Sequence, residues 1–172
     1  MDLETAIRTR RTHKAFAPEP VSRATLLELF ELARWAPNHH LTGPWRFRVL
    51  GDQARTLLAA EAERDASGSA AKLDRAPTLI VASAAGSEAV AERREDLLAT
   101  AIAAYIVLLG AHARGLAGYW RTVPLLDQPP VRAALSIAAD EQLVGLLHLG
   151  YPIQEQRVPA RAGVEDFAFF LP

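Results

Sequence analysis

The stretch Leu97-Leu-Ala-Thr-Ala-Ile-Ala-Ala-Tyr-Ile-Val-Leu-Leu-Gly-Ala111 decides the fold, because it holds no charged side chain. It forms the second half of a helical pattern over residues 88–113, which Gly115 ends. A helix without a polar face is buried on every side, either at the centre of a protein or in a subunit interface. The run is shorter than the roughly 20 apolar residues that cross a bilayer. We therefore predict a buried helix in a soluble protein that has no membrane partner.

Strand patterns lie on both sides of this helix along the chain. Residues 78–83 and 143–150 are continuous apolar runs, as in strands covered on both faces, whereas residues 45–50 alternate like a half-buried strand. A short strand over residues 116–122 follows the helix. Further helices are predicted over 2–9, 22–36, 52–65 and 129–137, and a flexible loop over 67–71. This order predicts a single α+β domain over residues 1–172, with three layers around a central sheet.

The composition argues against several classes of protein. A formal net charge of −1 disfavours a protein whose main task is to bind nucleic acid. The absence of cysteine excludes disulfides, thiolate nucleophiles, Cys-ligated zinc and iron–sulfur clusters, and it fits a reducing cytoplasm. The N-terminus is acidic and amphipathic rather than basic and then apolar, so it does not resemble a secretory signal. We expect a cytoplasmic protein.

Basic side chains gather just after the first predicted helix. The cluster consists of Arg8, Arg10, Arg11, His13 and Lys14, with the hydroxyl of Thr12 among them. One interpretation is a solvated helix end, where positive side chains suit the helix dipole. A second is a phosphate site, since guanidinium groups form forked hydrogen bonds with such anions. A nucleic-acid-binding arm is a third interpretation, which neither interleaved aromatic residues nor a wider basic stripe supports.

A second candidate for anion binding is Trp120-Arg121-Thr122, which combines a guanidinium, a hydroxyl and an indole able to lie against a flat ring. Trp120 stands at the end of a predicted strand, where functional loops concentrate in α/β folds. It could line a pocket or pack in the core, whereas the alternating strand around Trp45 favours core packing.

The remaining polar motifs argue against metal and side-chain catalysis. His39 and His40 follow Asn38 in a loop, and adjacent histidines point in different directions, so no metal site is predicted. The chain also lacks the Gly-x-Gly-x-x-Gly fingerprint, a Walker phosphate loop and the Gly-x-Ser-x-Gly motif of serine hydrolases. A cofactor that brings its own reactivity would explain why no catalytic side chain is visible.

Four motifs, in this order, resemble the nitroreductase family of FMN enzymes, and especially its short bacterial NAD(P)H nitroreductases. They are Arg10-Arg11-Thr12, Trp35-Ala-Pro-Asn-His-His-Leu-Thr-Gly-Pro-Trp-Arg-Phe47, Gly118-Tyr-Trp-Arg-Thr122 and Leu143-Val-Gly-Leu-Leu-His-Leu-Gly-Tyr-Pro152. The resemblance implies an α+β homodimer with a central mixed, mainly antiparallel sheet flanked by helices. It also implies two FMN sites at the subunit interface and ping-pong hydride transfer from NAD(P)H, through the flavin, to a nitroaromatic, quinone or similar acceptor.

The resemblance assigns cofactor contacts to individual residues but no catalytic acid, base or nucleophile. The ribityl phosphate would be held by Arg10, Arg11 and Thr12, with a further contact from Arg157 in Arg-Val-Pro. The isoalloxazine and phosphate end would be lined by Trp120, Arg121 and Thr122, while His39 would approach the flavin from the partner subunit.

The chain departs from the family pattern in three places and leaves alternative functions open. Thr12 replaces Ser and keeps the hydroxyl, and Gly43 replaces the usual Gln before Pro44. Trp35 stands where a basic residue is common, so that flavin contact is either lost or replaced by stacking. The alternatives are a non-catalytic flavin-binding dimer, a specialised enzyme acting on one metabolite or on flavin itself, and a small nucleic-acid binder.

Overall fold

The computed structural model describes residues 1–64, 73 and 75–172, which surround a four-stranded sheet with the strand order β1-β2-β4-β3. The strands are β1 (Trp45–Val49), β2 (Thr78–Ala84), β3 (Ala117–Arg121) and β4 (Gln142–Gly150). Neighbouring strands run antiparallel, and a parallel bridge joins Thr12 to Gly118 on β3. The predicted α+β class and mainly antiparallel sheet are confirmed.

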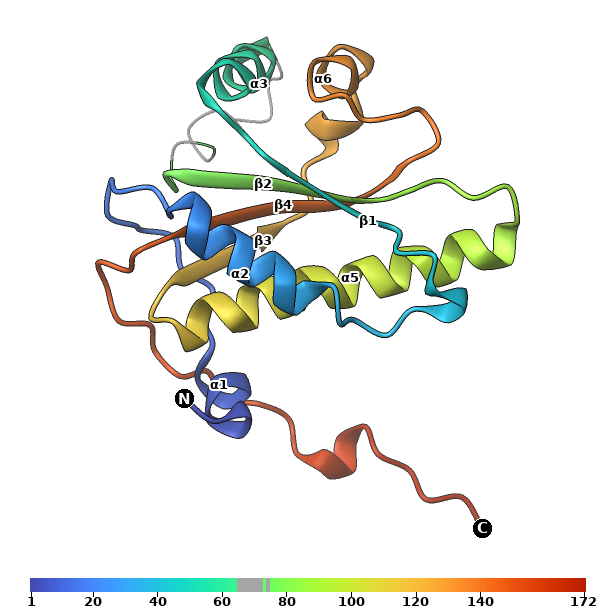
Figure 1. The fold of residues 1–172 in the computed structure, drawn as a ribbon. Coiled ribbons are helices and arrows are strands. Elements are labelled where there is room, and N and C mark those ends of the chain that lie inside the picture. Colours follow the sequence, from blue (N-terminus) through green and yellow to red (C-terminus); the bar gives the residue numbers. More distant parts are fainter. Residues whose placement is uncertain (65–72, 74) are drawn as a thin grey trace.

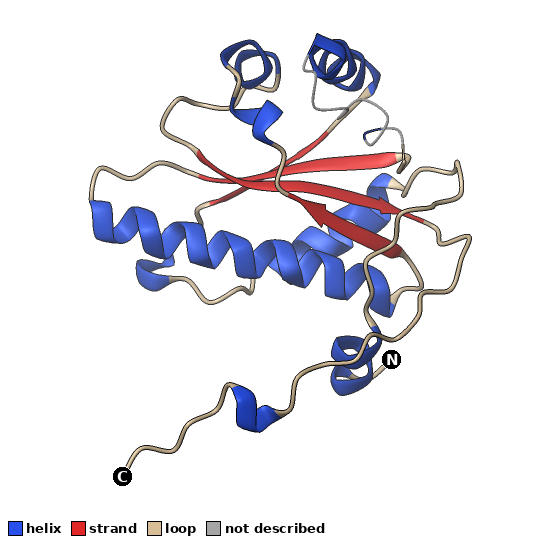
Figure 2. Cartoon of the chain, turned by 180° about the vertical axis from the view of Figure 1, so that it is seen from behind, coloured by secondary structure: helices blue, strands red, loops and turns tan. Residues whose placement is uncertain are grey.

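Helices cover both faces of the sheet. On one face lie α2 (Arg23–Ala33) and α5 (Val90–Ala113), and on the other lie α3 (Asp52–Arg64) and α6 (Pro129–Ala134), as Figure 1 shows. The same three layers are visible from behind in Figure 2. Each face has its own hydrophobic core, with Leu58 and Leu146 in one and Leu29 and Leu147 in the other. Alternate residues of the central strands therefore serve opposite cores, which explains their unbroken apolar runs.

The long helix α5 packs against the sheet and α2, but it is not covered on every side. Leu98 and Ile102, in its apolar half, are exposed in the single chain, so this half is not wholly buried at the centre of one chain, and burial in a subunit interface stays a prediction. Asp96, in its charged half, is buried instead. By length and composition α5 could cross a membrane, and half of its apolar window is buried inside the protein.

The remaining element boundaries lie close to the predicted ones. Helix α1 spans Leu3–Thr9, and Ser22 caps α2 by accepting a hydrogen bond from the Thr25 amide. Helix α6 is shorter than predicted, because the chain turns at Ser136 with φ of 52°. The loop predicted over residues 67–71 lies outside the described residues.

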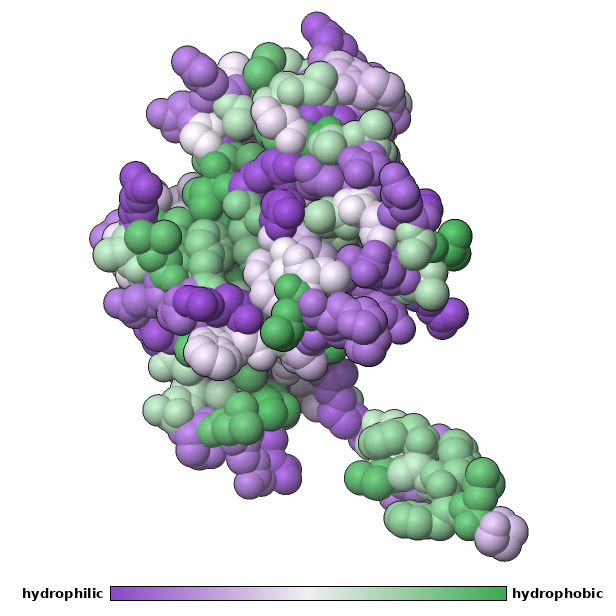
Figure 3. Space-filling view, turned by 45° about the vertical axis from the view of Figure 1, so that its right-hand side comes forward, coloured by the Kyte–Doolittle hydropathy of each residue, from purple (hydrophilic) through white to green (hydrophobic). Residues whose placement is uncertain are grey.

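The chain after β4 leaves the body as an irregular tail. Its only described helical turn is the 3-10 helix Val164–Asp166, and the end of the tail projects away from the three layers (Figure 1). Figure 3 shows this end as a separate, largely apolar lobe. Phe170 is 98% exposed, which is unusual for a large aromatic side chain.

His148 on β4 is a fully buried histidine, and the part of the chain that the structure describes offers no hydrogen-bond partner to either ring nitrogen. Its ring lies 5.4 Å from the Tyr119 ring. Burial, together with the positive charges of Arg121, Arg75 and Arg55, lowers the pKa of His148 to about 4. The folded protein therefore holds this imidazole neutral at neutral pH.

We expect the stability of the protein to fall as the pH drops from 6.5 to about 4, because in that window the unfolded chain binds a proton at residue 148 and the folded chain does not. The difference between the His148 pKa of the unfolded chain and that of the folded chain corresponds to a loss of about 3 kcal/mol of unfolding free energy, at 1.36 kcal/mol per pKa unit. Urea unfolding at a series of pH values should show this loss in the wild type and in a control with exposed His40→Ala. A His148→Leu variant should lack it, and equal pH slopes in wild type and His148→Leu would contradict the prediction.

Candidate functional site

Four arginines meet at the C-terminal end of α1 and the start of the tail. They line a cavity of about 210 Å³ that is formed by Arg10, Arg11, Thr12, Gln156, Arg157, Pro159 and Arg161. Among the residues that the structure describes, no carboxylate lines this cavity. Like charges held together in this way repel one another, and an anion placed between them relieves the repulsion. We call this group the arginine cradle.

Backbone pairing places the cradle beside strand β3. Thr12 forms a parallel bridge with Gly118, and the His13 amide donates to the Gly118 carbonyl oxygen at 3.1 Å. The segments Arg10-Arg11-Thr12 and Trp120-Arg121-Thr122, which are more than 100 residues apart in sequence, therefore lie on adjacent stretches of backbone.

The arginines of the cradle differ in how they are engaged. Arg11 donates from one Nη to the carbonyl oxygens of Arg8 and Arg10, each at 2.7 Å, so it satisfies carbonyl groups at the end of α1. Arg10 lies over the Tyr105 ring, 5.8 Å from its centroid. In the described part of the chain, the guanidinium groups of Arg10, Arg157 and Arg161 make no hydrogen bond or ion pair within the protein. The helix-end interpretation thus applies to Arg11, whereas the Arg10 guanidinium has no hydrogen-bond partner in the described part of the chain.

Two histidines adjoin the cradle in a wider cleft of about 580 Å³ that Arg11 and Gln156 also line. The His112 Nε2 atom lies 2.8 Å from the Thr9 hydroxyl. Burial lowers the pKa of His13, with help from His112 and Arg10. Burial also lowers the pKa of His112, with help from Arg10 and Arg11. Both imidazoles are therefore held neutral at neutral pH, and the positive charge of this region resides on the arginines.

The three residues of the β3 motif point in different directions. The Trp120 indole packs toward the α2–α5 core and donates from Nε1 to the Val144 carbonyl oxygen at 3.1 Å. Arg121 follows it on a strand and so faces the opposite side of the sheet. Of the two interpretations of Trp120, the structure favours core packing.

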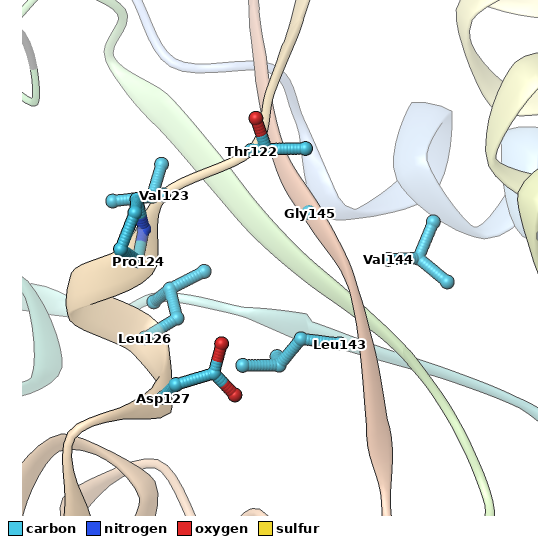
Figure 4. Close-up of a pocket in the computed structure, with 8 residues that line it drawn as sticks. All are labelled: Thr122, Val123, Pro124, Leu126, Asp127, Leu143, Val144 and Gly145. Atoms are coloured by element: carbon cyan, nitrogen blue, oxygen red, sulfur yellow. The ribbon is translucent and has the colours of Figure 1, made fainter.

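Thr122 lies beyond the strand and lines a second cavity, of about 220 Å³, at the end of β3 (Figure 4). The cavity lies between the segment that follows β3, with Val123 and Leu126, and strand β4, with Leu143 and Gly145. Thr122 is thus exposed at a cavity, whereas the Arg121 Nη1 atom is buried and has no hydrogen-bond partner among the described residues.

The loop that carries His39 lies far from the cradle in a single chain. Trp35, which precedes it, is 76% exposed and stacks with the Arg34 guanidinium, 5.9 Å from the ring centroid. The loop contacts α5 at Asp96, whereas the cradle contacts α5 at Tyr105. These positions are nine residues apart, or about 14 Å along a helix. One chain therefore does not bring Trp35 and His39 to the cradle.

The rings of His39 and His40 lie with their centroids 3.8 Å apart. The prediction that these side chains point in different directions is therefore wrong. His40 has a left-handed backbone with φ of 54°, which turns its side chain toward its neighbour. Within the described residues, no group of three or more histidine and carboxylate side chains could hold a metal ion.

Sequence reasoning missed Gln156 and Arg161 of the cradle. Arg161 follows Arg157 by four residues in a tail without helical or strand periodicity, so no sequence pattern could orient it. The sequence does indicate basic character here, because two arginines lie close together in an otherwise irregular segment.

Comparison with known proteins gives one consistent result. Residues 7–151 match the model of the Nitroreductase family. The Escherichia coli K12 protein named "Putative NAD(P)H nitroreductase YdjA" is 30% identical over 161 residues, which is 87% of each chain. A nitroreductase-like protein from Bacillus cereus superposes with a TM-score of 0.89 at 24% identity, covering 99% of this chain and 96% of the other. The Desulfovibrio desulfuricans protein described as a "putative nitroreductase in complex with FMN" has a TM-score of 0.81 at 25% identity, covering 98% of this chain and 96% of the other.

Proposed function

Because this chain belongs to the nitroreductase family, we propose that it is an FMN-dependent oxidoreductase that takes hydride from NAD(P)H and reduces a nitroaromatic, quinone or similar acceptor. FMN, when bound, supplies the redox chemistry of both half-reactions. The chain itself needs to bind the cofactor, orient it and exclude water. We assign no acid, base or nucleophile to a side chain.

The arginine cradle is the observation that carries this proposal. A phosphate monoester carries close to two negative charges at neutral pH, and arginine forks match its oxygens. Arg10 and Arg157 have no hydrogen-bond or ion-pair partner within the described residues, and Thr12 lines the same cavity. These residues fit the phosphate of FMN, and Arg11 would hold the end of α1 in place beside it.

The rest of the flavin site requires a second copy of the chain. We propose a cytoplasmic homodimer in which Leu98 and Ile102 of α5 become buried in the subunit interface. Trp35 and His39 of one subunit would then reach the flavin held by the cradle of the partner. Thr122 and the β3 backbone would line the same flavin, with Trp120 and Arg121 shaping that segment from opposite faces of the sheet.

The absorption spectrum of the purified protein tests this function. We expect visible flavin bands that bleach when NADH or NADPH is added without oxygen and that return when a quinone or nitroaromatic acceptor is supplied. A protein that stays colourless after incubation with FMN would overturn the proposal. A protein that binds FMN but is not reduced by either nucleotide would instead favour a non-catalytic flavin-binding dimer.

A further inference from the structure

The loop over residues 38–43 has a strained and fixed backbone. His40 and Leu41 have φ values of 54° and 53°, and Gly43 has φ of 55°. A left-handed conformation at a residue other than glycine costs of order 1 kcal/mol or more and persists only where the surroundings impose it. Leu41 gains no burial in return, since it is 89% exposed. Hydrogen bonds must therefore hold this loop in shape.

Three linked hydrogen bonds hold the loop over residues 38–43 in this conformation. The Asn38 Oδ1 atom accepts from the Gly43 amide at 2.7 Å, and its Nδ2 donates to the Thr42 hydroxyl at 2.9 Å. Thr42 in turn donates to the Asp96 Oδ1 atom at 2.6 Å. The three hydrogen bonds follow one another from the Gly43 amide to Asn38, then to Thr42, and end at the Asp96 carboxylate on α5.

Asp96 is an unusual end point, because its side chain is almost entirely buried, with a residue exposure of 4%. A buried carboxylate is costly, and the Thr42 hydroxyl is the one hydrogen-bond partner that the described residues give its side chain. Helix α5 packs against all four strands of the sheet and against α2. Asp96 thus connects an exposed loop to a helix that packs on the sheet.

We propose that Asp96 is a positioning residue that acts through Thr42 and Asn38 to hold His39 in the orientation from which it reaches the flavin of a second copy. This inference rests on the proposed function, since the loop has no flavin to reach in a single chain.

The experiment compares Thr42→Val, which removes the hydroxyl and keeps the shape, with Thr42→Ser, which keeps the hydroxyl. Although Thr42→Val should lower the melting temperature, because it leaves the buried Asp96 carboxylate without its hydrogen-bond partner, we expect it to weaken FMN binding about tenfold and to abolish the hydrogen-exchange protection of the Gly43 amide. Thr42→Ser should retain wild-type values for both. Asp96→Ala should match Thr42→Val, and the double variant should be no worse than either single one, because both remove the same link.

The outcomes separate this inference from the proposed function. Wild-type FMN affinity in Thr42→Val with loss of Gly43 protection would overturn the positioning role, since the loop would be free without any consequence for the flavin. Retained Gly43 protection in both Thr42→Val and Asp96→Ala would overturn it as well, by showing that the link does not fix the loop. Failure of the wild-type protein to bind FMN would instead overturn the proposed function, and with it the role assigned to the loop.

Discussion

A Gly145→Ala variant is expected to lose about 4 kcal/mol of unfolding free energy. Gly145 sits on β4 where the register with β2 shifts, and its φ of 151° is a conformation that side-chain-bearing residues rarely adopt. A Cβ atom there would lie 2.4 Å from the Trp120 Nε1 and 2.6 Å from the Arg121 carbonyl oxygen. The backbone oxygen cannot move aside as a flexible side chain could, so strand β3 would have to shift.

Two other glycines of the chain provide matched controls. Gly51 has an ordinary backbone conformation, and no atom lies within 4 Å of a Cβ added there. Gly51→Ala should therefore leave the stability nearly unchanged. Gly115 also has room but has φ of 77°, so Gly115→Ala should show the backbone strain alone, about 1 kcal/mol. Urea unfolding of the three variants separates strain from steric clash. If Gly145→Ala loses no more than Gly115→Ala, the close approach of β3 to β4 is not what requires glycine.

The fold could be predicted from the sequence because its signals are local and strong. The apolar run of residues 97–111 predicts a core helix, and the unbroken apolar strands predict a sheet covered on both faces. The burial of that helix could not be judged from the run alone. Whether Leu98 and Ile102 face protein or solvent depends on how many elements surround the helix, which no local pattern reports.

The site was predicted less completely, for physical reasons that differ between residues. The resemblance assigns Arg10-Arg11-Thr12 and Trp120-Arg121-Thr122 to one cofactor, whereas the bridge between Thr12 and Gly118 on β3 could be seen only in the structure. Trp120 and Arg121 were treated as one contact surface, although strand alternation sends their side chains to opposite faces. The position of Arg161 depends on where an irregular tail lies in the folded protein. The position of Asp96 depends on which loop packs over its helical turn.

A double variant, Arg10→Ala with Arg157→Ala, is expected to weaken FMN binding about 150-fold while riboflavin binding stays unchanged. Each guanidinium should contribute roughly 1.5–3 kcal/mol through charge-assisted hydrogen bonds to the phosphate, and the lower end of that range for two groups corresponds to a loss of this order. Riboflavin lacks the phosphate, so its affinity reports the ring site alone. Fluorescence titration of the same apoprotein with FMN and with riboflavin measures both quantities.

Arg8→Ala is the matched control for this pair. Arg8 lies on the same helix and is paired with Glu4 at 2.9 Å, but it does not line the cradle. Its removal should therefore leave the affinity for FMN unchanged, although it takes away one positive charge, the same change in charge that Arg10→Ala alone makes. An Arg8→Ala variant as weak as Arg10→Ala would show that a general positive field, rather than contact with the phosphate, attracts the cofactor. Parallel losses of FMN and riboflavin in the double variant would contradict the phosphate assignment in a different way, because they would place the two arginines against the ring system.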